Sequence, residues 1–243
     1  MNFYPIFWKD MLLIRRKPWR FFAASLVMPV LYLVTFGWGL GRGMRMDGGS
    51  YLEFVLPGIL VLSAMNNSFG PVSTSVNVSK LYTKTIEEVL VSPVSHWGIA
   101  LGRSLTGLVR GMFASLLLLV VALVSGVSLH VSTMFFLVLM LTSFCFASAG
   151  VAAAMVARSH EDMANFNSFF IIPMSFLAGT FFAPASLPEP FHSLILVYPL
   201  THASLVLREL SSGRDPSIAS VLVLTAYTIA FFFLAGMMVK RRE

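Results

Sequence analysis

Charged residues are scarce in this sequence of 243 residues: Asp, Glu, Lys and Arg make up 12%, whereas hydrophobic residues make up 57%. The mean hydropathy is +0.81. A water-soluble domain carries many more charges on its surface, and long apolar runs are typical of helices that cross a lipid bilayer. The composition therefore predicts an all-α polytopic membrane protein.

Several groups that catalysis requires are also missing. Cys145 is the single cysteine, which excludes an intrachain disulfide and a thiolate metal cluster. Gly102 and Gly107 have the glycine spacing of a phosphate-binding loop, but Leu108 and Val109 follow where Lys and Ser or Thr are required. No acidic residue lies inside a predicted span. We therefore expect no catalytic residue, metal or cofactor in this chain, and no ATP hydrolysis by it alone.

The basic residues are distributed along the chain rather than gathered in one stretch. The net charge is +6 and the pI is near 9.8, values that would suggest a nucleic-acid partner if the charges lay on one folded face. They lie instead at the ends of apolar runs, where they determine membrane topology. No nucleic-acid partner is expected.

The apolar runs predict six transmembrane helices and an N-terminal amphipathic helix in the headgroup layer. The amphipathic helix is expected at residues 1–20. A proline-punctuated stretch at 185–207 predicts a re-entrant helical segment before the last span, because broken helices at membrane depth must be packed inside protein. The expected spans are 21–40, 54–78, 104–125, 131–157, 163–182 and 217–239. A cleaved signal peptide is the alternative for the first run, but its apolar core would be shorter.

Charge asymmetry favours six spans over seven. With six, both chain ends and the loop at 80–103 share one side, which collects most of the Lys and Arg residues. A seventh span would send Lys240, Arg241 and Arg242 to the other side, against the positive-inside tendency. We therefore expect both termini, including the short tail at 240–243, in the cytoplasm.

The stretch from Lys80 to Arg103 is the long polar interruption in the first half of the chain. It predicts a short amphipathic helix outside the bilayer, ended by Ser92 and Pro93. A carboxylate pair beside an apolar surface suits docking of a soluble partner. The residues expected to make this contact are Thr85, Ile86, Glu87, Glu88, Val89, Leu90 and Pro93.

Polar residues inside the spans have two interpretations. Four of them recur at helical spacing on one face of the second span: Asn66, Gly70, Ser73 and Asn77. They either line a substrate path or pack against another helix, and both hold at a dimer seam. Arg110 lies about 10 Å beyond Arg103 on the same helix face. It either anchors an anionic substrate or gate, or extends back to the cytoplasmic headgroups.

Two motifs resemble a known family. E-E-V-L-V-S-P-V at Glu87–Val94, followed by Gly102 and Arg103, resembles the first cytoplasmic loop of the type-2 ATP-binding-cassette exporter permeases. F-F-A-P-A-S-L-P at Phe181–Pro188, then Y-P-L-T-H-A at Tyr198–Ala203, is similar to that family's signature before the last span. The family comprises drug, Nod-factor and polysaccharide exporters.

The resemblance implies the membrane subunit of an exporter in a bacterial inner membrane. It implies a second membrane half, which is either a copy of the same chain or a homologous half, and two ATP-binding subunits that hold ATP and Mg²⁺. The loop from Lys80 to Pro93 would carry the coupling helix. An outer re-entrant gate would involve Pro184, Pro188, Tyr198 and Pro199. The cargo would be an amphipathic drug, a lipid or a lipid-linked glycan.

Two other classes of membrane protein are alternatives. A single-component secondary transporter or channel normally carries carboxylates or histidines within its spans, and often an inverted repeat. Neither is visible in the sequence. A membrane-held assembly factor would not need the polar residues of the second span. Transport assays in vesicles, with and without ATP and an ion gradient, separate the three.

Replacing both Glu87 and Glu88 by Lys reverses the charge of the expected docking helix. We expect the ATP-binding subunit to dissociate, or transport to uncouple, while membrane insertion stays intact, because charge complementarity guides such contacts. Co-purification and transport assays measure the two effects. Unchanged association and transport in the double variant would contradict the docking role.

Overall fold

The computed structural model describes residues 3–16, 45–46, 49–90, 94–184 and 187–241, together with single positions between 19 and 39. The described elements are helical, apart from a pair of two-residue antiparallel strands, β1 (Arg45–Met46) and β2 (Gly49–Ser50). The expected all-helical class is confirmed over these residues. The first expected span, 21–40, lies outside the described residues except for single positions.

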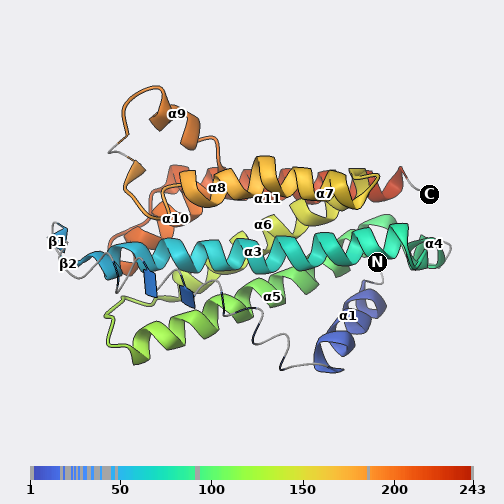
Figure 1. The fold of residues 1–243 in the computed structure, drawn as a ribbon, viewed down its shortest axis with the longest axis horizontal. Coiled ribbons are helices and arrows are strands. Elements are labelled where there is room, and N and C mark those ends of the chain that lie inside the picture. The colour runs from blue at the N-terminus through green and yellow to red at the C-terminus, as the bar shows by residue number, and fades with distance from the viewer. Residues whose placement is uncertain are drawn as a thin grey trace.

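Four long helices run lengthwise beside one another and form the body of the molecule (Figure 1). Each is long and apolar enough to cross a bilayer. They correspond to the second, third, fourth and last of the expected spans. These helices are α3 (Tyr51–Leu81), α5 (His96–Val124), α6 (Thr133–Val156) and α11 (Ile218–Lys240).

Helix α5 begins earlier than the sequence predicted, and this corrects the extent of the polar loop. The side chain of Ser95 caps the helix by accepting a hydrogen bond from the backbone N–H of Gly98 at 3.2 Å. Arg103 was expected at the end of the loop at 80–103, but it lies inside α5. The span expected from residue 104 follows the apolar run, whereas the cap at Ser95 determines where the helix starts.

The expected fifth span, 163–182, consists of three consecutive helical pieces. These are α7 (His160–Phe166), the π-helix η2 (Asn167–Ile171) and α8 (Ile172–Leu177). The N–H of Ile172 donates to the carbonyl oxygen of Asn167, five residues back. Pro173 follows and has no N–H to donate to the α-helical partner, which favours a wider turn here. Helical structure ends at Leu177 rather than at residue 182.

Two shorter helices follow, α9 (Phe191–Ile195) and α10 (Pro199–Ser211). The expected re-entrant stretch is divided at Tyr198, whose backbone is extended, and Pro199 is the first residue of α10. Proline suits this first position because its missing N–H needs no partner there. Helix α9 lies at the end of the bundle that also holds β1 and β2 (Figure 1).

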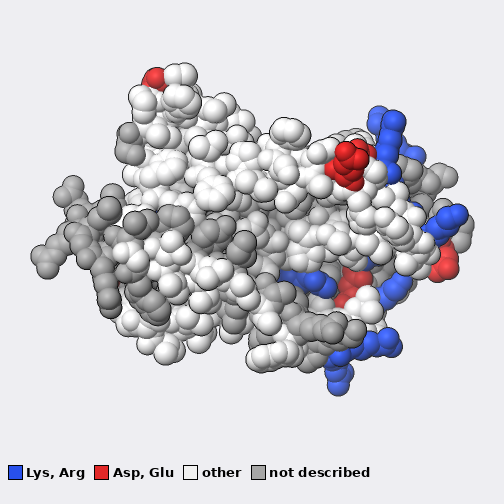
Figure 2. Space-filling model, viewed as in Figure 1, with Lys and Arg blue, Asp and Glu red and all other residues white. Residues whose placement is uncertain are grey.

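The opposite end of the bundle holds both ends of the chain, together with α1 (Tyr4–Arg16) and α4 (Thr85–Leu90) (Figure 1). Charged side chains gather at this end, which we call the charged end (Figure 2). Its exposed charged residues are Lys9, Arg15, Arg16, Lys84, Glu88, Arg158, Glu161, Asp162, Lys240 and Arg241. The long sides of the molecule in the same view are almost free of charge among the described residues.

Helices α3, α5 and α6 pack closely because Gly107 has no side chain. A Cβ atom there would lie 2.4 Å from the Cβ of Ala147 in α6 and 2.7 Å from the Cγ2 of Val72 in α3. Gly111, one turn further along α5, is crowded in the same way, 2.6 Å from the Oγ of Ser143. Small residues of this kind allow transmembrane helices to approach and gain van der Waals contact.

The substitution Gly107→Val is expected to destabilise the bundle by about 1–3 kcal/mol, because overpacking forces the three helices apart. Gly70→Val is the matched control, since no atom lies within 4 Å of a Cβ at Gly70. Both variants change glycine to the same residue inside a helix, so only packing differs. Thermal unfolding in detergent measures the effect. Equal unfolding temperatures for the two variants would contradict the packing role of Gly107.

Candidate functional site at the charged end

Helix α4 is presented by a tight turn after α3. The N–H groups of Tyr82 and Thr83 both donate to the carbonyl oxygen of Val78, which closes the end of α3. Lys84 then adopts a left-handed backbone with φ of 52°, and this reverses the chain direction before α4. The hydroxyl groups of Thr83 and Thr85 lie 3.0 Å apart across the turn.

The two faces of α4 differ as an amphipathic helix requires. Ile86 is buried at 8% exposure, and Val89 packs against the same core, whereas Glu88 is exposed. The described part of the expected docking surface is therefore Glu88 together with half-buried Thr85. The side chains of Glu87 and Leu90, and the whole of residues 91–93 with Pro93, lie outside the description.

Lys80 fastens the start of this loop to α6. Its ammonium group donates to the carbonyl oxygens of Ala154 at 3.1 Å, Met155 at 2.8 Å and Ala157. These are carbonyls at the C-terminus of α6, where a helix lacks internal donors and its dipole favours a cation. The ring of Tyr82 also stacks on His160, with centroids 5.0 Å apart. Helix α4 is thus anchored to the junction between α6 and α7.

A buried ion pair joins α1 to α5. One guanidinium nitrogen of Arg103 lies 2.9 Å and 3.0 Å from the two carboxylate oxygens of Asp10. The same nitrogen donates to the hydroxyl of Ser75 in α3 at 3.2 Å, and the hydroxyl of Thr106 donates to Asp10 at 3.3 Å. Asp10 is 5% exposed and Arg103 is 7% exposed. Three segments that are distant in sequence are therefore held at one point.

Gly102 lets α1 approach α5 beside this ion pair. A Cβ at Gly102 would lie 3.0 Å from the carbonyl oxygen of Phe3 and 3.1 Å from the Cβ of Ile6. Helix α1 was expected to be an interfacial helix, and Asp10 was not among the predicted site residues. The signal was present, because Asp10 is the only acidic residue before Asp47 and shares a helix face with Phe3 and Ile6.

Arg110 lies near the same ion pair. Together with Asp10 and Arg103 it lines a small cavity of about 30 Å³ between α1, α3 and α5. Two guanidinium groups thus share the surroundings of one carboxylate. Neither expected role of Arg110, as a substrate anchor or as a group extending to the headgroups, is tested by this geometry.

The polar residues of α3 lie in two different surroundings. Asn66 and Gly70 are half-buried, and the space around Gly70 is open. Ser73 is 3% exposed and donates to the carbonyl oxygen of Gly70 at 3.0 Å. Asn77 is fully buried, and its amide has no hydrogen-bond partner among the described residues. The first two residues face outwards from the chain, and the last two pack within it.

At the other end of the bundle, Arg208 of α10 binds backbone carbonyls rather than a carboxylate. It donates to the carbonyl oxygens of Phe54 at 3.1 Å, Gly179 at 3.0 Å and Thr180 at 3.3 Å. Its guanidinium carbon lies 3.9 Å from the centre of the Phe54 ring, a cation–π contact. Arg208 therefore joins α10 to the start of α3 and to the loop after α8.

The expected gate residues surround this contact. Pro184 lies within 2.6 Å of a Cβ built on Gly179, so the loop after α8 folds back on itself. The carbonyl of Pro188 accepts hydrogen bonds at the start of α9. Tyr198 and Pro199 form the break between α9 and α10. The structure brings these residues to one end of the bundle and leaves their role as a gate untested.

Comparison with known proteins now identifies the class. The fold is that of a polytopic helical membrane protein, with one charged end and one end closed by short helices. The family model described as ABC-2 type transporter matches residues 1–210. The chain therefore belongs to the ABC-2 type transporter family.

Curated relatives agree with this assignment. The chain is 29% identical over 230 residues to "Inner membrane transport permease YadH" of Escherichia coli (strain K12), covering 91% of this chain and 90% of the relative. It is 30% identical over 224 residues to "Nodulation protein J" of Rhizobium meliloti (strain 1021), covering 90% of this chain and 85% of the relative. The resemblance stated from the two motifs is confirmed at the level of the family.

Replacing Asp10 by Asn removes the carboxylate and leaves the buried Arg103 without its counter-charge. We expect a loss of about 3–5 kcal/mol of stability, because breaking one side of a buried ion pair strands the other charge. Helix α1 should also become accessible to trypsin after Arg15 and Arg16, which are already exposed. Thermal unfolding and limited proteolysis measure the two effects.

The control is Lys9→Gln, which removes an exposed charge from the neighbouring position of the same helix. Arg103→Gln and the double variant complete a mutant cycle. If Asp10→Asn unfolds at the temperature of Lys9→Gln, or if the cycle shows no coupling, the ion pair does not hold α1 in place.

Proposed function

We propose that this chain is the transmembrane permease subunit of an ATP-driven exporter in a bacterial inner membrane. It moves an amphipathic drug, a lipid or a lipid-linked glycan out of the cytoplasm, and separate subunits hydrolyse ATP. The observation that carries this proposal is the family match over residues 1–210. The relative whose name includes "Inner membrane transport permease" supports the membrane assignment.

The proposed topology has six spans with both termini in the cytoplasm. Helices α3, α5, α6 and α11 supply four spans, residues 21–40 supply the first, and the segment from Met163 through α8 supplies the fifth. The re-entrant segment is residues 185–207. The exposed basic residues at the charged end support a cytoplasmic position for that end, because cytoplasmic loops carry an excess of Lys and Arg.

The coupling step follows from how α4 is anchored. ATP binding draws two soluble subunits together, and each subunit presses on the α4 helix seated on it. Thr85 and Glu88 make the described part of this contact, with Glu87, Leu90 and Pro93 expected beside them, whereas Ile86 and Val89 pack against the core and hold the helix in place. Force on α4 passes to α6 through the Lys80 ammonium and to α7 through the Tyr82 ring. ATP favours one of two conformations only through its differential affinity for them.

The ion pair between Asp10 and Arg103 extends this path to α1 and α5. A buried pair resists shear because separating it strands two charges in a low-dielectric environment. The charged end therefore moves largely as one body. Arg110, beside the pair, is retained as an element of the substrate path or of the dimer seam.

A second membrane half completes the transporter, either another copy of this chain or a homologous subunit. The open face of α3 at Asn66 and Gly70 is the proposed seam or path lining, and Ser73 and Asn77 of the same helix belong to the proposed site from within the chain. Two ATP-binding subunits complete the assembly and hold ATP and Mg²⁺. This chain contributes no residue to nucleotide binding.

At the outer end, the short helices α9 and α10 close the path. Pro184, Pro188, Tyr198 and Pro199 give this segment its breaks, and Arg208 secures it to α3 and to the loop after α8. Opening the gate requires the Arg208 guanidinium to break several hydrogen bonds to carbonyl groups at once. The closed state is therefore stable until ATP binding moves the cytoplasmic end.

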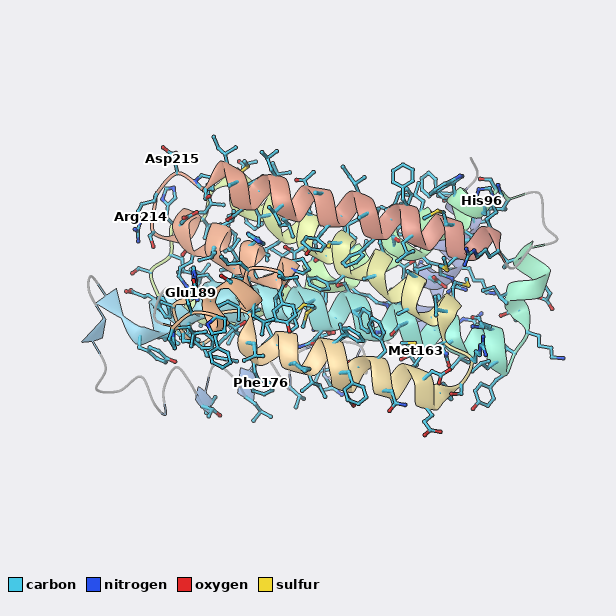
Figure 3. All side chains as sticks on the ribbon, turned by 90° about the horizontal axis from the view of Figure 1, so that it is seen from above. His96, Met163, Phe176, Glu189, Arg214 and Asp215 are labelled. Carbon is cyan, nitrogen blue, oxygen red and sulfur yellow. The ribbon has the colours of Figure 1, made fainter. Side chains whose placement is uncertain are left out.

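The test is gentle detergent purification of the tagged chain from its native membrane, followed by mass spectrometry of co-eluting proteins. We expect a soluble subunit with a Walker A motif at near-equal stoichiometry. It should be lost when the loop at 80–93 is altered and kept when exposed Arg214, at the far end of the bundle (Figure 3), is replaced by Gln.

Elution of the chain alone or only with itself, in several mild detergents, would contradict the proposal. The single-component secondary transporter would then take its place. Retention of the ATP-binding subunit after alteration of the loop at 80–93 would keep the exporter assignment and move the docking site elsewhere.

A further inference from the structure

An apolar groove lies along α6, between α11 on one side and the segment α7–η2–α8 on the other. In Figure 3 the two walls run side by side with α6 between them, and in Figure 1 α6 lies beneath both. The groove has a volume of about 560 Å³, which falls in the range of about 300–1,000 Å³ typical of ligand sites. Phe69 and Phe146, which are 2% and 1% exposed, form the deepest part of the groove.

Small side chains on α6 create the groove. Ala149, Ala152 and Ala153 form its floor, where larger residues would have filled the space between the walls. The opposite wall is a continuous aromatic stack. Phe166 stacks on Phe69 at 5.7 Å and on Phe170 at 4.8 Å. The groove is open along its side, since Val156 is 60% and Phe170 is 55% exposed while both line it.

The groove has charged residues at one end only. Arg158, in the turn between α6 and α7, and Asp162, in the first turn of α7, line it at the charged end of the bundle. The backbone N–H groups of Arg158 and Ser159 donate to the Asp162 carboxylate at 2.7 Å and 3.2 Å. These hydrogen bonds, with that from Arg158 the strongest, lower the pKa of Asp162. The carboxylate is thus occupied as a helix cap.

Arg158 is exposed at the charged end of the groove, which we call its mouth. Helix α11, the other wall, ends at the same end of the bundle with exposed Lys240 and Arg241. The mouth therefore joins an almost wholly apolar space to a region rich in basic residues. Among the described residues there, exposed basic side chains outnumber the carboxylates that are not already hydrogen-bonded as a helix cap. An anionic headgroup attached to an apolar chain complements both parts.

We propose that this groove binds a membrane glycerophospholipid, with one acyl chain along α6 and the phosphate at Arg158. The floor from Phe146 to Ala157 is about 16 Å long at 1.5 Å per residue. One leaflet of a bilayer contributes about 15 Å of hydrocarbon. The groove therefore accommodates a chain that starts at the headgroup layer and reaches the bilayer centre.

A helix of a second copy is the alternative occupant of this groove, and the variants described below distinguish it from a lipid. A headgroup phosphate at Arg158 adds an anionic partner to an exposed side chain that already interacts with the Asp162 carboxylate. The proposal depends on the chain spanning the membrane and is independent of transport direction and of the ATP-binding subunit.

The experiment uses the full chain, stripped of lipid in detergent and titrated with phosphatidylethanolamine while native mass spectrometry counts bound lipids. We expect one tightly held phospholipid per chain. Ala153→Leu fills the floor, and Val156→Phe covers the open side from an exposed position that tolerates a larger residue. Each should weaken binding about tenfold or more, because the acyl chain loses its apolar contact.

Arg158→Gln should also weaken phospholipid binding about tenfold, because a hydrogen bond to a charged group is lost. It should leave the binding of uncharged dodecyl maltoside unchanged. Phosphatidylglycerol and phosphatidylethanolamine should compete equally if the phosphate is the recognised group. The matched controls are Ala226→Leu, at an exposed position of α11 that does not line the groove, and Arg214→Gln, both expected to bind as the wild type does.

Three results would overturn the proposal. Unchanged lipid binding in both Ala153→Leu and Val156→Phe would show that the groove is not the lipid site. A shift between monomer and dimer in those variants, with lipid binding intact, would assign the groove to a contact between copies. If Arg158→Gln and Arg214→Gln change phospholipid binding equally, the lipid phosphate does not bind at Arg158. None of these results bears on the co-purification of the ATP-binding subunit.

Discussion

The buried ion pair between Asp10 and Arg103 is the interaction on which the arrangement of the charged end depends. It joins an N-terminal helix to α5 and, through the hydroxyl of Ser75, to α3. Because burying two charges is costly, the pair adds little net stability and mainly fixes how α1 lies on α5. Removing one partner is strongly destabilising, because the other charge is then left uncompensated. Helix α1 exposes Tyr4, Trp8, Leu12 and Leu13, so it is held beside this ion pair mainly by the close approach of Phe3 and Ile6 to Gly102.

Basic side chains secure both ends of the bundle in a related way. Lys80 donates to carbonyls at the C-terminus of α6, and Arg208 donates to carbonyls of α3 and of the loop after α8. Lys80 binds carbonyls that the C-terminus of α6 leaves without internal donors, whereas Arg208 binds two carbonyls in the loop after α8 and one in the first turn of α3. The helices in the middle of the bundle use small residues instead, as at Gly107 and Gly111. Polar contacts thus define the ends and close packing defines the centre.

The sequence was informative where a single physical signal determines structure. Long apolar runs predicted the helices observed as α3, α5, α6 and α11, because crossing a bilayer requires about 20 apolar residues. The helix near Glu88 was also expected, and the structure has it at Thr85–Leu90. Limits of helices were less predictable. Helix α5 starts at a serine cap rather than at the edge of its apolar run.

Contacts between distant segments could not be read from the sequence. Asp10 and Arg103 are 93 positions apart, and nothing in either neighbourhood specifies the other. The groove on α6 depends on three alanines facing aromatic residues of α7 and η2, so it exists only after the helices pack. The π-turn at Asn167–Ile171 likewise changes which residues face the groove, and helical periodicity assumes that no such turn is present.

The most direct test of this account is a disulfide between α1 and α5 beside the ion pair, at Ile6→Cys and Gly102→Cys. The Cβ atoms of the two positions would lie 3.1 Å apart, a few tenths of an ångström less than the about 3.5–4.5 Å that a disulfide adopts, so a small outward shift of α1 is enough to form the bond. The natural Cys145 is buried and should not interfere. If the charged end moves as one body, the cross-link forms in native membranes and the ATP-binding partner keeps its transporter-stimulated ATPase activity. Failure to form the cross-link, or loss of that stimulation once it forms, would show that α1 and α5 move apart and would contradict the account.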